Sequence, residues 1–259
     1  MRKEQVYEIL NKVYFGEERH EKRVIDRLSV ALRGASLFVD IGASLGQYTY
    51  FANKVMREGL IIAVEPDPIR FEELARNCEK WRSFGNNELV PINAALSDSD
   101  GKIRFYTTKT NVSGGLFVHE VKPAVLESSG GELLHWEEII VDCCKLDTVL
   151  AHRMPDIVKI DVEGAELRVL RGAENTLRNG RTRFLVELHG GWADPDGQKD
   201  LNDVYRFMER FGYQASDFAG HTLFARRGLV EQGQRWLRAS AALFRRAVQS
   251  QARRTTSHC

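Results

Sequence analysis

The chain has 259 residues, 43% of them hydrophobic and 28% charged, and its 37 basic and 36 acidic side chains give a formal net charge of +1. This composition is typical of a globular protein and excludes a disordered, collagen-like or coiled-coil chain. No apolar run approaches the roughly 18 residues of a membrane span, and the length allows one large α/β domain or two small ones.

The N-terminal segment, residues 1–33, is predicted to be helical. Apolar side chains recur at helical spacing through residues 6–32 with a break near Gly16, which indicates two amphipathic helices. Residues 1–22 contain neither the continuous apolar stretch nor the small-residue cleavage site of a secretory signal peptide. We therefore expect a cytoplasmic protein.

Strands and helices are predicted to alternate through residues 34–225. Short apolar runs that end in turn residues indicate buried strands, and apolar residues at helical spacing indicate helices. The predicted strands are residues 37–42, 60–64, 89–93, 103–107, 139–141, 156–162, 183–188 and 223–225. The predicted helices are residues 47–57, 68–80, 146–150, 165–177 and 201–211. This alternation is typical of βαβ units, so we predict an α/β fold with a doubly wound, mostly parallel sheet.

A long irregular insertion interrupts this pattern at residues 111–138. Long loops on α/β scaffolds often form lids or substrate walls. The insertion contains His119 and His135, which could approach a substrate, although histidines in loops are usually only solvated.

The near-neutral net charge conceals two parts of opposite charge. Residues 225–259 contain eight arginines and one glutamate, a formal charge of +7, whereas the preceding 224 residues carry 29 basic and 35 acidic groups, a formal charge of −6. Within the Arg-rich tail, residues 226–259, an apolar face recurs at helical spacing and predicts a C-terminal basic helix. This helix either packs on the acidic body, the alternative we prefer, or contacts an anionic membrane surface or an acidic partner. No nucleic acid partner is expected, because the body is acidic.

The four cysteines, Cys78, Cys143, Cys144 and Cys259, have neither paired C-x-x-C spacing nor a histidine at metal-ligand spacing. This argues against a zinc site and against a disulfide framework. We expect Cys78 and a member of the adjacent pair to be core residues and Cys259 to be a free thiol.

Ligands of a doubly wound sheet bind beyond the carboxyl ends of the strands, so the residues that follow each strand are candidates for function. The first such loop has Asp40 two residues before Gly42, and a second glycine at Gly46. The glycines permit a sharp turn and a close ligand, but their spacing is not the G-x-G-x-x-G of dinucleotide enzymes. An acid here is unfavourable beside a diphosphate and suits a cation. Glu65, at the end of the next strand, could accept hydrogen bonds from both hydroxyls of a ribose.

Two further strand ends carry polar side chains. Residues 93–98 are small and polar, so they could admit a flat adenine, although a plain turn has a similar composition. Lys159 lies within a later buried strand, and Asp161 and Glu163 follow at its end, on one side of the strand by its period of two. Adjacent carboxylates repel each other unless a cation, a shared proton or a basic partner is present. Glu166 is expected to complement the dipole of the helix that follows.

Together these segments resemble the FkbM family of S-adenosylmethionine-dependent methyltransferases. The resembling segments are residues 38–46 (FVDIGASLG), 64–68 (VEPDP), 93–98 (NAALSD), 159–166 (KIDVEGAE) and 169–173 (VLRGA). The resemblance extends over residues 21–225, and KIDVEGAE is its most specific motif. Ser44 departs from it, since members of the family commonly have asparagine there, and residues 111–138 and 226–259 lie outside the shared pattern.

The resemblance implies a Rossmann-like class I methyltransferase domain, with seven strands in its sheet, over residues 34–225. It also implies transfer of a methyl group from S-adenosylmethionine, with S-adenosylhomocysteine as the product, to a hydroxyl of a sugar, a glycan or a secondary metabolite. The first loop would surround the methionine end, Glu65 the ribose and residues 93–98 the adenine, while Asp161 and Glu163 would lie between cofactor and acceptor. The implied cofactor-binding residues are Asp40, Gly42, Ala43, Ser44, Gly46, Glu65, Pro66, Asn93, Ala94, Asp98 and Asp161.

A hydroxyl acceptor also needs a group that removes its proton. His189 follows the strand at residues 183–188, and a histidine has a pKa suited to a general base near neutral pH. It would otherwise be a strand-end histidine hydrogen-bonded to the backbone. Glu163 and Asp161 compete for the role of base, so the candidate catalytic residues are His189, Asp161 and Glu163. We predict no metal site, and a metal ion held by His189 and these acids is a weaker alternative.

Two other functions are compatible with these residues. The first is N-methylation of a peptide or an amine, in which the carboxylates would matter more than His189. The second is a non-catalytic nucleoside-binding protein that acts through its basic tail. The intact set of Asp40, Glu65, Asp161 and Glu163 argues against this second alternative.

Overall fold

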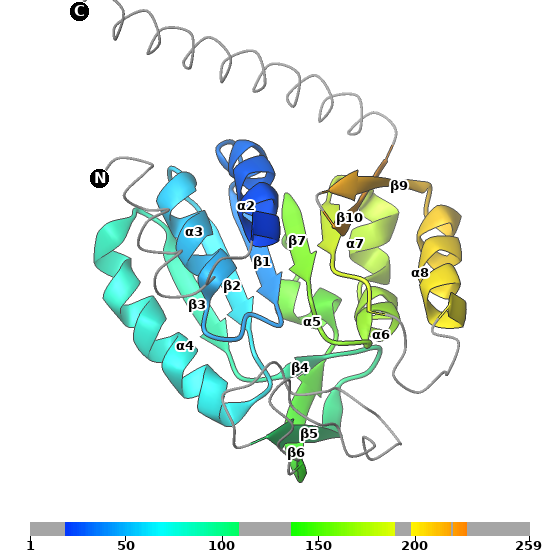
Figure 1. The fold of residues 1–259 in the computed structure, drawn as a ribbon, viewed down its shortest axis with the longest axis horizontal. Helices are drawn as coiled ribbons and strands as arrows, with labels where there is room; N and C mark the ends of the chain where they lie inside the picture. Colours follow the sequence, from blue (N-terminus) through cyan, green and yellow to red (C-terminus); the bar gives the residue numbers. More distant parts are fainter. Residues whose placement is uncertain (1–18, 109–135, 190–197, 219, 227–259) are drawn as a thin grey trace, which may run out of the picture.

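The structure is a computed structural model of the chain, and it describes residues 19–108, 136–189, 198–218 and 220–226 (Figure 1). Its helices are α2 (Arg19–Leu32), α3 (Gln47–Val55), α4 (Pro68–Trp81), the short η2 (Arg82–Phe84), α5 (Leu146–Leu150), α6 (Glu166–Arg171), α7 (Glu174–Asn179) and α8 (Gln198–Arg210). Its strands are β1 (Leu37–Ile41), β2 (Leu60–Val64), β3 (Glu88–Ile92), β4 (Ala95–Leu96), β5 (Gly101–Thr108), β6 (Trp136–Cys144), β7 (Ile157–Ile160), β8 (Arg183–Val186), β9 (Tyr213–Phe218) and β10 (His221–Arg226).

Seven strands form the main sheet in the order β3-β2-β1-β7-β8-β10-β9. The strands from β3 to β8 are parallel, and β10 pairs antiparallel with both β8 and β9. This confirms the predicted α/β fold with a mostly parallel sheet. The sequence did not predict β9, because only its two end residues, Tyr213 and Phe218, are buried and the four between them are exposed.

A second, three-stranded sheet has the order β4-β6-β5 and lies below the main sheet in Figure 1. Its two long strands contain the predicted strands at residues 103–107 and 139–141. The predicted insertion, residues 111–138, extends too far toward the C-terminus, because β6 already begins at Trp136. Residues 109–135, which contain His119 and His135, lie outside the described residues.

Helices cover the two faces of the main sheet, and the strand period of two decides which side chain meets which layer. On β1, Leu37, Val39 and Ile41 pack in the core that contains α5, α6, α7 and α8. Phe38 packs on the opposite face, in the core that contains α2, α3 and α4. Asp40 is two residues beyond Phe38, so its side chain also points toward the α3 layer. Cys78 and Cys143 are buried, as expected of core residues.

The first helix and the last strand of the described residues both belong to the domain that contains the main sheet. In α2, Val24, Ile25, Leu28 and Leu32 are buried against the sheet, so this part of the predicted N-terminal segment belongs to the domain core. Arg226, which we had assigned to the tail, is the last residue of β10 and donates hydrogen bonds of 3.0 Å to the carbonyls of Leu177 and Arg178. The predicted first N-terminal helix and the predicted basic helix lie outside the described residues. No helix among the described residues is long and apolar enough to cross a bilayer.

Candidate active site

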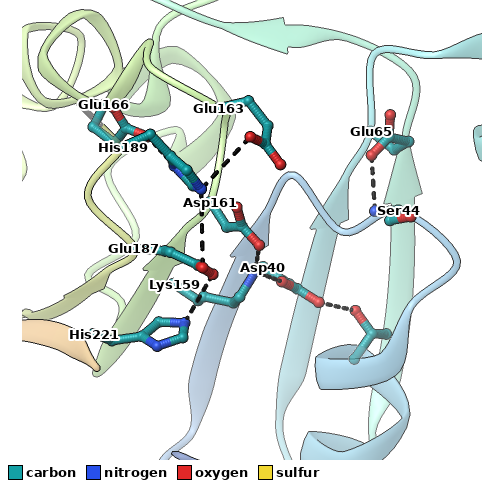
Figure 2. Close-up of polar contacts among 11 residues, drawn as sticks. Asp40, Ser44, Glu65, Lys159, Asp161, Glu163, Glu166, Glu187, His189 and His221 are labelled. Carbon is teal, nitrogen blue, oxygen red and sulfur yellow. Dashed lines mark hydrogen bonds and ion pairs between the residues drawn. The ribbon is translucent and has the colours of Figure 1, made fainter. Parts of the chain in front are cut away.

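The candidate site lies where the strand order of the main sheet reverses. The chain runs from β1 outward through β2 to β3, and later from β7 outward to β8, so β1 and β7 are neighbours with connections that leave in opposite directions. A crevice forms beyond the carboxyl ends of such a pair, and ligands of α/β sheets bind there. Asp40 is on β1 and Asp161 directly follows β7, so both flank this point (Figure 2).

The loop from β1 to α3 is a tight turn held on the neighbouring strand. The backbone N–H groups of Gly42 and Ala43 both donate to the carbonyl of Val64, at 3.0 Å. Gly42 and Gly46 have φ angles of 72° and 92°, and Ser44 has a φ of 50°. These are left-handed conformations, which asparagine adopts more readily than serine does. The geometry therefore supplies a physical reason for the asparagine that the resemblance leads us to expect at the position of Ser44.

Replacing Gly42 by alanine is expected to lower the free energy of unfolding by about 2–4 kcal/mol, the combined cost of a left-handed alanine and an overpacked contact. A Cβ at Gly42 would lie 1.8 Å from the carbonyl oxygen of Asp161, so the two strand ends would have to separate. Urea unfolding measures the loss. Gly34→Ala is the control, because a Cβ at Gly34 meets nothing within 4 Å. Equal stability of the two variants would contradict the packing argument.

Glu65 ends β2 and is buried beside this loop. Its Oε2 accepts a hydrogen bond of 2.8 Å from the Ser44 N–H, and its Oε1 accepts one of 3.0 Å from the Asp67 N–H. Burial raises the pKa of Glu65 to about 7, in spite of these two donors. The Asn93 amide donates to the carbonyls of Glu65 and Pro66, at 2.8 and 3.2 Å. The predicted ribose and adenine residues therefore meet at Glu65.

Two other residues predicted near the adenine have different surroundings. Ala94 is buried, directly after Asn93. Asp98 lies beyond β4 and lines an open cavity of about 840 Å³ together with Asp100 and Lys145. None of the residues that line this cavity is another predicted cofactor residue. Asp98 therefore follows a strand, β4, that pairs with β6 of the second sheet, and it lines a cavity that no other predicted cofactor residue lines.

Asp40 is completely buried and joins β1 to its neighbours. Its Oδ2 accepts a hydrogen bond of 2.7 Å from the Thr49 hydroxyl of α3, and its Oδ1 lies 3.9 Å from the Lys159 ammonium. Burial raises the pKa of Asp40, and the charge of Lys159 partly offsets this. The Lys159 Nζ also lies 3.0 Å from Asp161 Oδ2 and 4.5 Å from the centre of the Tyr48 ring. Lys159 is thus the basic partner of Asp161 and Asp40, whereas the basic group beside Glu163 is His189.

The segment after β7 has a different backbone from the one that we predicted. We expected Asp161 and Glu163 on one side of a continuing strand, but β7 ends at Ile160 and the chain turns. Glu163 has a φ of 53° and Gly164 a φ of 104°, so a period of two does not apply there. The turn still directs Glu163 into the site, with its Oε2 3.6 Å from His189 Nε2 (Figure 2).

His189 is held in the site by a buried carboxylate. Its Nδ1 lies 3.0 Å from Glu166 Oε1, which also accepts a hydrogen bond from the Gly164 N–H. Burial disfavours the charged imidazole, but the hydrogen bond to Glu166 and the charges of Glu163 and Asp161 outweigh it and raise the pKa of His189 to about 9. This pKa lies above the ordinary value of a histidine, on which the expectation of a near-neutral base was founded.

Sequence reasoning gave no site role to three residues that the structure places here. Glu166, which we expected only to complement the dipole of the following helix, contacts His189. Glu187 Oε1 lies 3.9 Å from His189 Nε2. His221 contacts the other oxygen of Glu187, with its Nε2 at 3.2 Å. The position of Glu187 directly after a predicted strand could have marked it as a candidate site residue. The sequence carries no such sign for His221, because it reaches the site only through the pairing of β10 with β8.

The site could also hold a cation. Ligand atoms of Asp161, Glu187 and His189 lie within 4.8 Å of one another. Lys159 already places a positive charge 3.0 Å from Asp161, and a metal ion would have to share that carboxylate with it.

Comparison with known proteins decides the family. Residues 40–215 match the family model of the methyltransferase FkbM domain. The chain belongs to the FkbM methyltransferase family. Over 190 residues it is 27% identical to the hexuronic acid methyltransferase AglP of Haloferax volcanii, covering 72% of this chain and 70% of that one. Over 229 residues it is 28% identical to the 31-O-demethyl-FK506 methyltransferase FkbM of Streptomyces tacrolimicus, covering 78% of this chain and 84% of that one.

A crystal structure of a methyltransferase FkbM from Methylobacillus flagellatus KT aligns with a TM-score of 0.48 at 15% identity. The alignment covers 73% of this FkbM-family chain and 43% of that protein, so the chain spans less than half of its length.

Proposed function

We propose that this FkbM-family protein is an S-adenosylmethionine-dependent O-methyltransferase that acts on a hydroxyl of a sugar, a glycan or another metabolite. The observation that carries the proposal is a histidine held by a buried carboxylate, His189 on Glu166, next to the strand-end acids at the β1–β7 switch point. The two relatives, which are named for methylation of a hexuronic acid and of 31-O-demethyl-FK506, support it. The catalytic unit proposed is the domain of residues 34–225 together with α2.

The donor chemistry of the site fits this cofactor. Glu65 offers carboxylate oxygens to the two hydroxyls of a ribose, and Asn93 and Pro66 lie beside it. Asp161, which is half-buried, offers a carboxylate on the other side of the β1–α3 loop, which suits the positive sulfonium. Asp40 is completely buried behind it and acts through Lys159. When bound, the cofactor supplies an activated methyl group, and the reaction is an in-line displacement by the acceptor oxygen.

His189 is proposed as the general base. A carboxylate on Nδ1 selects the imidazole tautomer that keeps its proton on Nδ1, so Nε2 is left as the proton acceptor. Nε2 would accept the proton of the acceptor hydroxyl as that oxygen is methylated. Glu163 and Glu187 both lie close to Nε2, and their charges stabilise the imidazolium that results.

The raised pKa of His189 is compatible with this role once the cofactor is bound. A sulfonium held by Asp161 and its neighbours adds positive charge to the site, and a like charge lowers the pKa of a histidine. Binding of the cofactor would therefore favour the neutral imidazole that accepts a proton. N-methylation of an amine and binding without catalysis remain the rivals, and the acceptor assay below separates them.

Two measurements test the proposal. Isothermal calorimetry of the full chain with S-adenosylmethionine and with S-adenosylhomocysteine should detect binding of both, and a folded protein that binds neither overturns the proposal. Incubation of cell extract with the protein and methyl-labelled cofactor should then label a hydroxyl as a methyl ether. Labelling of an amine would favour N-methylation, and cofactor binding without any labelled product would favour the non-catalytic rival.

The affinity for S-adenosylhomocysteine is expected to fall about tenfold from pH 8 to pH 6, because one pKa unit corresponds to a tenfold change in protonation ratio. Hydroxyl donors need the ionised Glu65, whose pKa in the free protein is about 7, so a proton must leave before binding below pH 7. His189 is protonated throughout this range and adds no slope. Calorimetry at both pH values measures the change, and Glu65→Gln should bind weakly and without this slope. A pH-independent affinity in the wild-type protein would contradict the role of Glu65.

A further inference from the structure

The two carboxylate oxygens of Asp67 have different kinds of partner. Asp67 is the N-cap of α4, and its Oδ1 accepts hydrogen bonds of 2.9 and 3.0 Å from the backbone N–H groups of Ile69 and Arg70. Its Oδ2 accepts a hydrogen bond of 2.9 Å from the Arg70 guanidinium and another from the Thr107 hydroxyl. Capping of the helix requires only the first oxygen. The second oxygen therefore binds groups that a helix cap does not need.

The Thr107 hydroxyl comes from the second sheet. Thr107 is in β5, which pairs with β6 and belongs to the sheet β4-β6-β5. Thr107 is 5% exposed and the Asp67 side chain is 1% exposed, so their contact is closed to water. A buried carboxylate that loses one of its donors is left partly unsatisfied, which is unfavourable. The contact thus fixes Asp67, and with it the connection from β2 to α4, on the second sheet.

The main chain of Asp67 contacts the proposed ribose acid, Glu65. The Asp67 N–H donates a hydrogen bond of 3.0 Å to Glu65 Oε1, and the Ser44 N–H donates one of 2.8 Å to Oε2 (Figure 2). Pro66 and Pro68 have no N–H, so Asp67 is the only main-chain donor of this Pro-Asp-Pro segment. A shift of Asp67 would therefore turn the Glu65 carboxylate.

We propose that Asp67 and Thr107 are positioning residues for Glu65: the second sheet holds Asp67, and Asp67 holds the Glu65 carboxylate toward the two ribose hydroxyls of the cofactor. This deepens the proposed function and rests on Glu65 as the acid that binds the ribose. Thr107 acts on the cofactor only through Asp67 and Glu65. The sequence gave neither residue a role, because their contact joins positions 40 residues apart.

Other groups act on Glu65 and decide the conditions of the test. Burial is the main cause of its pKa of about 7, the N–H donors and the charge of Arg70 lower this pKa, and the charge of Asp67 raises it. The Asn93 amide also holds the loop, through the carbonyl of Glu65. At pH 8 Glu65 is largely ionised, and a variant that lowers its pKa leaves it so. Measurements at pH 8 therefore report the position of Glu65 and not its charge.

The test compares two ligands that differ only at the ribose. Calorimetry of the full chain at pH 8 measures the affinity for S-adenosylhomocysteine and for its 2′,3′-dideoxy analogue. The wild-type protein is expected to prefer S-adenosylhomocysteine about tenfold or more, because a site built for hydroxyls rejects an analogue that lacks them. A displaced Glu65 reduces this preference, whereas a general weakening of the domain lowers both affinities equally.

Two variants should reduce the preference. Thr107→Val removes the hydroxyl, and Asp67→Asn keeps an oxygen for the helix cap but places an amide nitrogen opposite the Arg70 guanidinium. In each, the affinity for S-adenosylhomocysteine is expected to fall about three- to tenfold, the equivalent of one hydrogen bond, and that for the dideoxy analogue to change by no more than about twofold. Thr107→Ser keeps the hydroxyl and should restore the wild-type preference. Thr107→Val leaves Asp67 paired with Arg70, so it is expected to fold even where Asp67→Asn does not.

A second aspartate of the same kind provides the matched controls. Asp100 accepts a hydrogen bond of 2.9 Å from the Lys145 N–H and one of 3.2 Å from the Thr148 hydroxyl. Asp100→Asn and Thr148→Val therefore alter hydrogen bonds of the same type that do not involve residues 65–67. Both should leave the two affinities unchanged, within about twofold.

The outcomes separate this inference from the proposed function. A wild-type preference for S-adenosylhomocysteine in either folded variant overturns the inference and leaves the methyltransferase proposal intact. An equal fall for the two ligands would show a merely structural role and also overturns it. A wild-type protein that binds both ligands equally removes Glu65 from the ribose and the inference with it, and a folded wild-type protein that binds neither overturns the proposed function as well.

Discussion

Lys159→Met is expected to lower the free energy of unfolding by about 3–5 kcal/mol, the usual cost of removing one partner from a buried ion pair. Lys159 is 2% exposed, and it lies between the fully buried Asp40 and the half-buried Asp161. Methionine keeps the length and the apolar stem of the side chain, so the loss is one of charge and not of volume. Domains of this size are stable by only about 5–15 kcal/mol, so a urea titration would show a large shift of the midpoint.

The loss should also depend on pH. Burial raises the pKa of Asp40 and the charge of Lys159 opposes this, so in Lys159→Met the Asp40 pKa rises further. A raised carboxyl pKa means that the folded variant takes up a proton more readily than the unfolded chain, which stabilises it as the pH falls. The gap between variant and wild type is therefore expected to be smaller at pH 5 than at pH 8.

A surface pair provides the matched control. Lys102 lies 2.6 Å from Asp142, and the two side chains are 67% and 68% exposed. Lys102→Met should cost no more than about 1 kcal/mol, since exposed ion pairs contribute little. Similar losses of unfolding free energy in Lys102→Met and Lys159→Met would contradict the argument that burial makes the ion pairs of Lys159 important for stability.

His189→Ala is expected to slow methyl transfer by about 10²–10⁴-fold, the usual contribution of a general base. Affinity for S-adenosylhomocysteine should change little, because Glu65 and the β1–α3 loop lie on the other side of the switch point (Figure 2). The wild-type rate should rise with pH through the titration of His189 in the cofactor complex, since only the neutral imidazole accepts a proton. Single-turnover assays with the acceptor found by methyl labelling measure both effects.

Glu163→Gln tests the competing base. Glu163 Oε2 is 3.6 Å from His189 Nε2, and burial raises the pKa of Glu163, so it too could take up a proton. If His189 is the base, Glu163→Gln should keep most of the rate and shift its pH dependence to lower pH, because a negative neighbour is lost. A collapse of the rate in Glu163→Gln, with a mild effect in His189→Ala, would transfer the role to Glu163.

The sequence predicted the local elements of this protein well. The bounds of β2 and α5 agree with the predicted ranges, and the ends of α4 differ from them by a single residue. Apolar runs and helical periodicity are properties of short segments, and the turn residues after them mark where each strand ends. For the same reason Asp40, Glu65, Asp161 and His189 could be expected at one sheet edge before any coordinates were known.

Other features depend on contacts between distant segments. β9 forms because β10 offers it hydrogen-bonding partners, and its polar sequence alone does not indicate a strand. Asp98 follows β4, and only the pairing of β4 with β6 shows that this segment belongs to a second sheet. The left-handed turn at Glu163 likewise shows up only in the backbone.

By itself, then, the sequence determined the fold class, the family resemblance and the acids at the strand ends, because all of these are carried by short contiguous motifs. Only the tertiary structure decided the contacts of His189 with Glu166 and Glu163, the pairing of Lys159 with two carboxylates, and the approach of Glu187 and His221. These depend on strand order and register, which bring residues up to 181 positions apart, such as Asp40 and His221, onto one face of the sheet. Burial in that face raises the pKa of Asp40, because the pKa of a side chain depends on its surroundings rather than on its neighbours along the chain.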